Sequence, residues 1–399
     1  MSKPLSPFSK EQLLPQEETL EIYKHKSELF IGIPKETAFQ EKRVCLTPDA
    51  VSAIVSNGHR VLIESEAGEG ANFSDKDYSE AGAEVTKDTA KVYSCPMILK
   101  VEPPTLDELE LINPQTTLIS ALQIKTQTKK YFEKLAAKRI TALAFEFIRD
   151  EDGAFPAVRA LSEIAGTASV LIASELLSNS SNGNGLMFGN ISGVPPLEVV
   201  ILGAGTVGEF AARSAIGLGA NVKVFDNSIT KLRCLQANLG RTIYTSTIQP
   251  KYLSKALKRC DVVIGAVRGK DRSPILVSET MVENMKKGSV IIDVSIDMGG
   301  CFETSEITTH DNPTYRKNGV IHYCVPNIPA RYSRTASASI SNIFTPYLLK
   351  IADDGGLEHA IRFDKGLKNG LYFYHGILTS RAVGEWFDLK HSDINLLIF

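Results

Sequence analysis

The sequence predicts an α/β protein built from two doubly wound parallel-sheet domains. Three observations support this prediction. Strand-like and helix-like runs alternate from Leu29 to about residue 150, a second such series runs through residues 198–327, and a glycine-rich turn opens the second series. Such alternation is typical of parallel sheets with crossover helices. The chain of 399 residues is long enough for two domains of ordinary size.

Composition narrows the class of protein. Hydrophobic residues make up 43% of the chain and charged residues 23%, which is typical of globular proteins. The formal net charge of −2 gives no electrostatic reason to expect nucleic acid or a membrane as a partner. No apolar run reaches bilayer length, and the first residues lack the apolar core of a signal peptide. The six cysteines are scattered without a CxxC pair, which disfavours disulfides and zinc. We therefore expect a cytoplasmic protein without a bound metal.

The first series of elements is expected to form the first sheet. Strands are predicted at residues 28–34, 59–65, 96–102, 116–122 and 140–148, and helices at 47–58, 75–83 and 126–139. The first of these helices has Thr47 in the N-cap position and Pro48 at its first helical position. Residues 1–27 are polar and are predicted to be an extension, with a short helix at 16–26.

The second series begins with a long helix rich in small residues, predicted at 161–179, and an exposed loop at 178–196. Five strands are predicted to form the second sheet, at residues 198–202, 221–225, 261–266, 289–294 and 319–327. The tail at 341–378 shows no strand pattern, so we expect it to be mainly helical and to return to the first domain.

The glycine turn predicts a dinucleotide site. Gly203, Gly205 and Gly208 follow a strand-like run and precede a helix, which is the context of the Rossmann fingerprint. The first glycine permits the tight turn, the second allows the pyrophosphate to approach the backbone, and the third lets helix and strand pack closely. The N-terminus of the helix, with Thr206 and Val207, then faces the phosphates with unpaired N–H groups.

The residues that end the other strands complete this prediction. Asp226 lies 18 residues after Gly208 and can bind both ribose hydroxyls, whereas its charge would repel a 2′-phosphate. The cofactor is therefore predicted to be NAD rather than NADP. Val267, Asp297 and Asn327 follow three further strands, where ligands bind in doubly wound sheets.

Several segments between about Phe30 and Ile351 carry a resemblance to a known family. They include IGIPKE, RVCLTPDAV, NGHRVLIE, MILKVEPP, SEIAG, VVILGAGTVG, GSVIIDVSIDMGG, TTHDNPTY and GVIHYCVPNIP. The chain resembles the alanine dehydrogenase family, which shares its fold with the NAD-binding subunit of proton-translocating transhydrogenase. The resemblance implies a Rossmann NAD domain at 159–332, inserted into a discontinuous substrate domain at 28–158 and 333–399. It also implies a homo-oligomer.

The resemblance implies roles for five residues. Arg43 matches the arginine that holds the substrate carboxylate, a task that suits a guanidinium fork. Taken alone, an arginine at this position would be read as an ordinary surface residue. Asp297 matches an active-site aspartate near the nicotinamide, and Asn327 matches a residue that contacts cofactor and substrate. Ser162 and Val267 match contacts on the cofactor side.

Two positions depart from the family pattern. Glu102 stands where active alanine dehydrogenases have a lysine, and Gln123 stands where they have the histidine that acts as acid and base. Glutamine cannot titrate, and a glutamate beside a 2-oxo acid would repel the carboxylate that Arg43 attracts. Lys100 could replace the missing lysine or form a salt bridge with Glu102. Lys125 has the same spacing from Gln123, although a solvated lysine is the simpler interpretation.

Three functions remain open. The first is NAD-dependent oxidative deamination of L-alanine, or of a similar small amino acid, to the 2-oxo acid. The second is an NAD-binding protein that is catalytically weakened or resembles the transhydrogenase subunit. The third is an enzyme whose substrate carries a cation that Glu102 would bind. His310 and His322 are interpreted as structural residues, because they follow the Asp297 turn rather than lying in the substrate domain.

Overall fold

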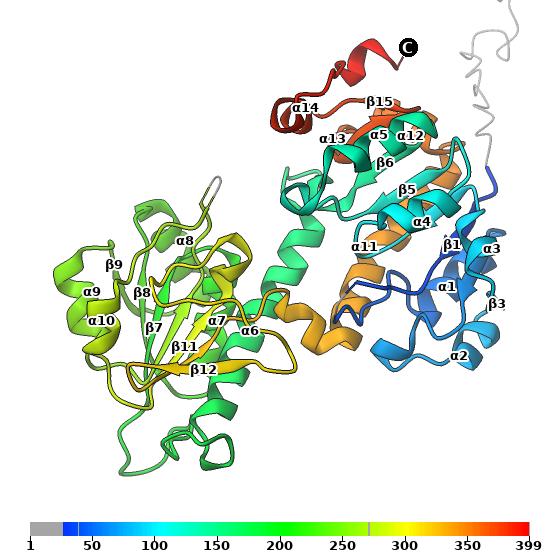
Figure 1. Ribbon diagram of the computed structural model, residues 1–399. Coiled ribbons are helices and arrows are strands. Elements are labelled where there is room, and N and C mark those ends of the chain that lie inside the picture. Colours follow the sequence, from blue (N-terminus) through cyan, green and yellow to red (C-terminus); the bar gives the residue numbers. More distant parts are fainter. Residues whose placement is uncertain (1–26, 39, 270–271, 399) are drawn as a thin grey trace, which may run out of the picture.

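The computed structural model describes residues 27–38, 40–269 and 272–398. Two α/β lobes are joined by two long helices, α6 (Pro156–Leu177) and α11 (Ser333–Asp353) (Figure 1). These helices contact each other, so the connection between the lobes is itself packed. The predicted helix at 16–26 lies outside the described residues.

The first sheet has eight strands in the order β15-β14-β6-β5-β4-β1-β2-β3. Neighbours from β6 to β3 are parallel, while β14 pairs antiparallel with both β6 and β15. The strand order reverses between β1 and β4, and such a switch point opens a crevice at the carboxyl ends of the strands. The strands are β1 (Phe30–Ile33), β2 (Arg60–Glu64), β3 (Glu84–Thr86), β4 (Met97–Leu99), β5 (Thr117–Ser120), β6 (Thr141–Ala144), β14 (Leu371–Tyr374) and β15 (Ile377–Leu378).

The second sheet has seven strands in the order β12-β13-β11-β10-β7-β8-β9. Only the edge strand β12 is antiparallel to its neighbour. The order reverses between β7 and β10, which gives this lobe its own switch-point crevice. The strands are β7 (Glu198–Leu202), β8 (Asn221–Phe225), β9 (Tyr244–Ser246), β10 (Val262–Gly265), β11 (Val290–Asp293), β12 (Thr314–Lys317) and β13 (Val320–Tyr323).

The remaining helices cover the two sheets. In the first lobe they are α1 (Pro48–Ser56), α2 (Asp75–Glu80), α3 (Thr89–Tyr93), α4 (Leu106–Leu111), α5 (Lys129–Ala137), α12 (Leu357–Phe363), α13 (Lys365–Gly370) and α14 (Arg381–Phe387). In the second they are α7 (Thr206–Gly217), α8 (Ile229–Leu239), α9 (Pro250–Leu257) and α10 (Glu279–Glu283). The α/β class and the two doubly wound sheets confirm the predicted fold. The predicted cap of α1 is also confirmed, because the Thr47 side chain accepts a hydrogen bond from the Ala50 N–H.

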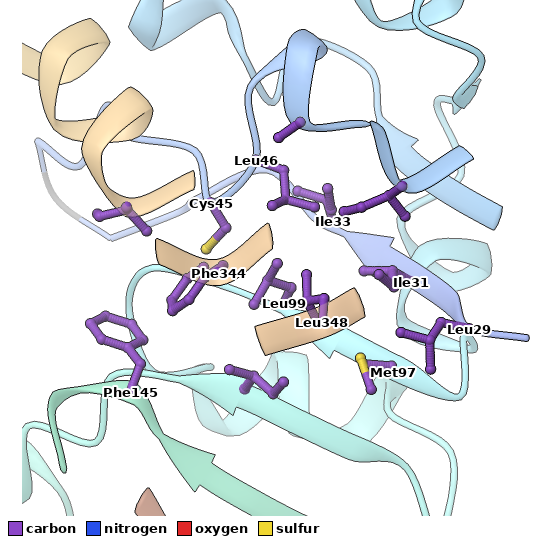
Figure 2. Packing of buried hydrophobic residues seen from close by; sticks show 14 of the residues in the cluster. Leu29, Ile31, Ile33, Cys45, Leu46, Met97, Leu99, Phe145, Phe344 and Leu348 are labelled. Carbon is purple, nitrogen blue, oxygen red and sulfur yellow. The ribbon is translucent and has the colours of Figure 1, made fainter. Parts of the chain in front are cut away.

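The tail returns to the first lobe, as expected, but its predicted lack of strands is wrong. Strand β14 pairs with β6, so residues distant in sequence complete the first sheet. Phe344 and Leu348 of α11 pack near Leu99 and Ile33 in the core of that lobe (Figure 2). The Phe344 ring also meets that of Phe145 edge to face, with the centroids 5.3 Å apart. The tail is therefore an integral part of the first lobe.

Helix α6 is long and apolar enough to cross a membrane by length and composition alone, the one such helix among the described residues. In the fold it packs against α7 and α11 and carries buried residues such as Val170 and Ile172. Packing in the core of the second lobe and against α11 therefore accounts for its apolar composition.

Candidate active site

A cavity of about 350 Å³ opens at the switch point of the second sheet. The residues predicted to bind a cofactor at the glycine turn, on β8, on α6 and after β10 all line it: Ser162, Gly203, Gly205, Thr206, Val207, Asp226 and Val267. Seven predicted residues from four separate segments of the chain thus line one cavity. Asn327, the remaining predicted cofactor contact, lies at the junction with the first lobe instead, where its side chain bonds Glu41.

Glycine occupies the three positions of the turn for different structural reasons. Gly203 adopts φ +108°, and a Cβ there would lie 2.3 Å from the carbonyl oxygen of Ala266. A Cβ on Gly208 would lie 1.9 Å from the carbonyl oxygen of Gly203. Gly205 has an ordinary φ of −84°, and its Cβ would meet no protein atom within 4 Å. The fold therefore requires glycine at 203 and 208, whereas at 205 the space in front of the backbone is left open.

Asp226 holds the turn in place through both carboxylate oxygens. Its Oδ2 accepts a hydrogen bond from the Ala204 N–H at 2.8 Å, and its Oδ1 accepts one from the Ser228 N–H at 2.7 Å. These bonds fix the carboxylate at the end of β8, on the wall of the cavity. A ligand hydroxyl that enters the cavity would therefore find an oriented acceptor.

The crevice of the first sheet contains a buried ion network around Arg43. Arg43 donates from Nε and Nη2 to the two carboxylate oxygens of Glu41, and its Nη2 also reaches Oε1 of Glu102 at 3.3 Å. The Arg43 side chain is only 4% exposed. Burial alone would raise the pKa of Glu41, but the hydrogen bonds and charge of Arg43 outweigh it and lower that pKa. The guanidinium is therefore already engaged by two carboxylates of its own chain.

Glu102 and Gln123, the two positions that depart from the family pattern, are direct partners. The Gln123 side-chain amide donates to Oε2 of Glu102. Desolvation, and then the negative charge of Glu41, raises the pKa of Glu102 to about 7 against the opposing effect of Arg43. Gln123 has a left-handed backbone with φ 46°, and its N–H and that of Leu122 donate to Oε1 of Glu146.

Lys100 does not take part in this contact. Its side chain is 1% exposed, and Nζ lies 3.2 Å from Oε2 of Glu36 and 3.3 Å from Oε1 of Glu108. The predicted alternative of a salt bridge between Lys100 and Glu102 is therefore wrong. The ammonium pairs instead with carboxylates on the segment after β1 and on α4. Burial would lower the pKa of Lys100, but the two carboxylates raise it overall.

The two lobes meet where these crevices open. The Asn327 side chain donates to Glu41 at 3.0 Å, while the Asn327 N–H donates to Oδ1 of Asp297 at 3.0 Å. Asp297 itself is solvent-accessible, although the surrounding protein raises its pKa by partial desolvation. Arg43, Asp297 and Asn327 are thus brought together across the junction.

Of the other residues named in the sequence analysis, His322 is buried, whereas His310 and Lys125 lie at the junction between the lobes. His322 is fully buried between Thr304 and the carbonyl oxygen of Val320, which confirms its structural role. His310 lies at the junction between the lobes, where its N–H donates to the side-chain oxygen of Gln40. Lys125 contacts Met298 from across the same junction.

Sequence reasoning missed Glu41 and Glu36. Both precede Arg43 on the segment after β1, and both enter the buried ion network. A sequence signal for them existed: two glutamates follow the end of the first strand, within ten residues of Arg43. Such a strand end lies near the switch point, so several charges could be expected there. Their burial and their partners could be known only from the fold.

The protein therefore belongs to the class of two-domain α/β proteins in which each domain is a doubly wound sheet with its own switch point. Family models match nearly the whole chain: "Alanine dehydrogenase/PNT, N-terminal domain" matches residues 32–165, and "Alanine dehydrogenase/PNT, C-terminal domain" matches residues 169–381. The chain belongs to the alanine dehydrogenase/PNT family. This confirms the resemblance found in the sequence.

Individual relatives agree with this family. "Alanine dehydrogenase 2" of Staphylococcus aureus (strain USA300) is 38% identical over 366 residues, which span 91% of this chain and 98% of that protein. A solved L-alanine dehydrogenase is 37% identical, with a TM-score of 0.84 over 90% of this chain and 99% of its own. A transhydrogenase from Sinorhizobium meliloti, 22% identical with a TM-score of 0.76 over 88% of this chain and 99% of its own, shows the shared fold. The chain is thus an alanine dehydrogenase-like oxidoreductase.

Proposed function

We propose that this protein is an NAD-dependent dehydrogenase that deaminates L-alanine, or a similar small amino acid, to the 2-oxo acid. One observation carries the proposal: Asn327 and Asp297, at the strand ends of the lobe that holds the glycine-turn cavity, are bonded to each other, and Asn327 is also bonded to Glu41 of the Arg43 network. A ligand held by one lobe can therefore meet a ligand held by the other.

The cavity fits a dinucleotide on chemical grounds. The open space in front of Gly205 admits a pyrophosphate close to the backbone, and the N-terminus of α7 supplies N–H groups and a positive dipole end. Asp226 would bind the adenosine ribose, while Ser162 and Val267 would border the rest of the molecule. When bound, NAD supplies the hydride acceptor.

The chain's own residues would orient the amino acid. The Nη1 edge of Arg43 points away from its bonds to Glu41, so this edge is the donor that we assign to the substrate carboxylate. A guanidinium binds a carboxylate through directed, charge-assisted hydrogen bonds. Burial of Arg43 keeps water away from this contact, which strengthens it.

Cofactor choice is the first test. We expect NAD(H) to bind at least tenfold more tightly than NADP(H), a difference of about 1.4 kcal/mol, because Asp226 repels a 2′-phosphate. Titration calorimetry on the purified protein measures both affinities. In Asp226→Ala the preference should shrink. Equal affinities in the wild type would refute the role of Asp226.

Gly205 and Gly208 provide a sharper test of the cofactor site. We expect Gly208→Ala to destabilise the second lobe by about 1–3 kcal/mol, because its Cβ would overlap the backbone of Gly203. Gly205→Ala should keep its unfolding midpoint yet lose at least about tenfold in NAD affinity, since its Cβ occupies only the open space. Unchanged NAD affinity in Gly205→Ala would place the pyrophosphate elsewhere.

A second function is favoured by one specific observation. Arg43 is engaged by Glu41 and Glu102, which an anionic substrate would have to disturb. The protein would then bind NAD with little turnover, or would prefer a substrate with an additional cation for Glu102. NADH formation with a panel of L-alanine, other small amino acids and basic amino acids discriminates these functions. Turnover of L-alanine supports the first proposal, while a preference for basic amino acids supports a cation site.

A further inference from the structure

Glu102 and Gln123 form a pair at the place where the family histidine and lysine are absent. We propose that Glu102 is the catalytic residue that exchanges protons with the substrate, and that Gln123 is a positioning residue that holds its carboxylate. This inference rests on the proposed function, because it concerns how the same reaction proceeds in this cleft.

The geometry gives Glu102 the position that a proton carrier needs. It follows β4 at the switch point of the first sheet, and its side chain is 12% exposed. One carboxylate oxygen is 3.3 Å from Nη2 of Arg43, the residue assigned to the substrate carboxylate. The other accepts the hydrogen bond from Gln123. Because a glutamine amide does not titrate, Glu102 is the member of this pair that can gain and lose a proton.

The charges around Glu102 favour its protonated form. Glu36, Glu41 and Arg43 approach from the segment after β1, Lys100 lies on its own segment, and Glu108 lies on α4. Asp297 faces Arg43 from the second lobe. Glu146, which follows β6 in the first lobe, accepts a hydrogen bond from the Gln123 N–H. The buried ion network of the first lobe contains two cations, Arg43 and Lys100. It contains four carboxylates: Glu36, Glu41, Glu108 and Glu102 itself.

This environment suits acid–base catalysis near neutral pH. The raised pKa of Glu102, about 7, means that both protonation states are populated there. A group is most effective in proton transfer when its pKa lies near the working pH. The ionised form of Glu102 can accept a proton from water, and the protonated form can return it to the amine nitrogen.

The proton transfers balance over the reaction. The substrate ammonium first gives one proton to solvent, and ammonia takes a proton back after its release. Hydride loss from Cα to bound NAD would then leave an iminium. Water adds to it: a C–O bond forms and the C=N electron pair moves to nitrogen. Glu102 accepts the proton that this water loses and then donates it to the amine nitrogen. The C–N bond breaks, ammonia leaves with the bonding electrons, and the hydroxyl proton departs to solvent as the carbonyl forms. Overall, amino acid, NAD⁺ and water give 2-oxo acid, ammonium, NADH and one proton.

The first experiment does not require turnover. The infrared difference spectrum between wild type and Glu102→Gln, without NAD, should show a protonated carboxyl band in the wild type that disappears with a midpoint near pH 7. Glu108→Gln is the matched control, because Glu108 is also buried but pairs with Lys100, and this variant should keep the band. A wild-type spectrum with Glu102 ionised throughout pH 5–8 would overturn the inference.

The second experiment measures kcat against pH for L-alanine at saturating NAD. Glu102→Gln should lower kcat by roughly 10²–10⁴-fold and remove the limb near neutral pH, as expected for loss of an acid–base group. Glu102→Asp should restore part of the rate and the limb, while Glu108→Gln keeps the profile. Circular dichroism verifies that each variant folds.

The outcomes separate the two proposals. Wild-type turnover that persists in Glu102→Gln with an unchanged pH profile overturns the role of Glu102 and leaves the proposed function intact. A wild type that binds NAD but oxidises none of the amino acids in the panel overturns the proposed function, and the catalytic role of Glu102 fails with it.

Discussion

Arg43→Ala is expected to destabilise the folded chain by about 3–5 kcal/mol, because it leaves Glu41 and Glu102 buried without their shared cation. Glu41 is the more affected of the two, since its low pKa depends on Arg43. The variant should also lose its affinity for 2-oxo acids. Urea unfolding measures the stability, and calorimetry with pyruvate measures the binding.

A double variant separates charge from shape. Arg43→Met combined with Glu41→Gln removes both charges and keeps similar volumes, so it should recover much of the lost stability while still failing to bind pyruvate. NAD affinity should stay near that of the wild type in both proteins, because the glycine turn lies on the other sheet. If Arg43→Ala binds pyruvate as well as the wild type does, the arginine is purely structural.

Lys100→Met is expected to cost a similar amount, about 3–5 kcal/mol, because Glu36 and Glu108 would lose the ammonium between them. Burial raises the pKa of Glu36 even in the wild type. Without the ammonium, the pKa of Glu36 should rise further, and burial should also raise that of Glu108, which Lys100 helps to lower in the wild type. The penalty should therefore be full at pH 8 and should shrink as the pH falls towards about 4.5, where the unfolded carboxyls also take up protons. Urea unfolding at several pH values measures this trend.

The control for this variant is Lys76→Met. Lys76 is 82% exposed and pairs with Glu80 on the same helix, so its loss should change stability by less than about 0.5 kcal/mol. A Lys100→Met protein that unfolds like the wild type but no longer forms NADH would restore the alternative in which Lys100 replaces the missing lysine.

The sequence was sufficient to predict most of the fold. Alternating runs predicted the central strands of both sheets, because buried parallel strands are continuous apolar segments with clear boundaries. Strands β14 and β15 of the tail were missed, since they are only four and two residues long. β14 pairs antiparallel with β6, more than 200 residues away, and β15 pairs with β14. Local pattern carries little information about such a partner.

The candidate site divides in the same way. The glycine turn and Asp226 could be placed from spacing, because their role depends on neighbours along the chain. The partners of the charged residues could not. Lys100 is two residues from Glu102, yet Glu36 and Glu108 bind it, because the segment after β1 and helix α4 bring those carboxylates closer. Which ions pair in a crevice depends on the fold of several segments at once.

The two sheets share their strand order around the switch point, where the first strand of each series lies between the second and the fourth. This has a consequence for how such a protein diverges. Each crevice is formed by its own sheet, so under the proposed function the nucleotide and its reaction partner would be recognised by different lobes. Exchanges such as those at Glu102 and Gln123 alter one half and leave the other free of strain. Substitutions in the first lobe can therefore change the proposed acid–base residues while the proposed coenzyme site in the second lobe stays the same.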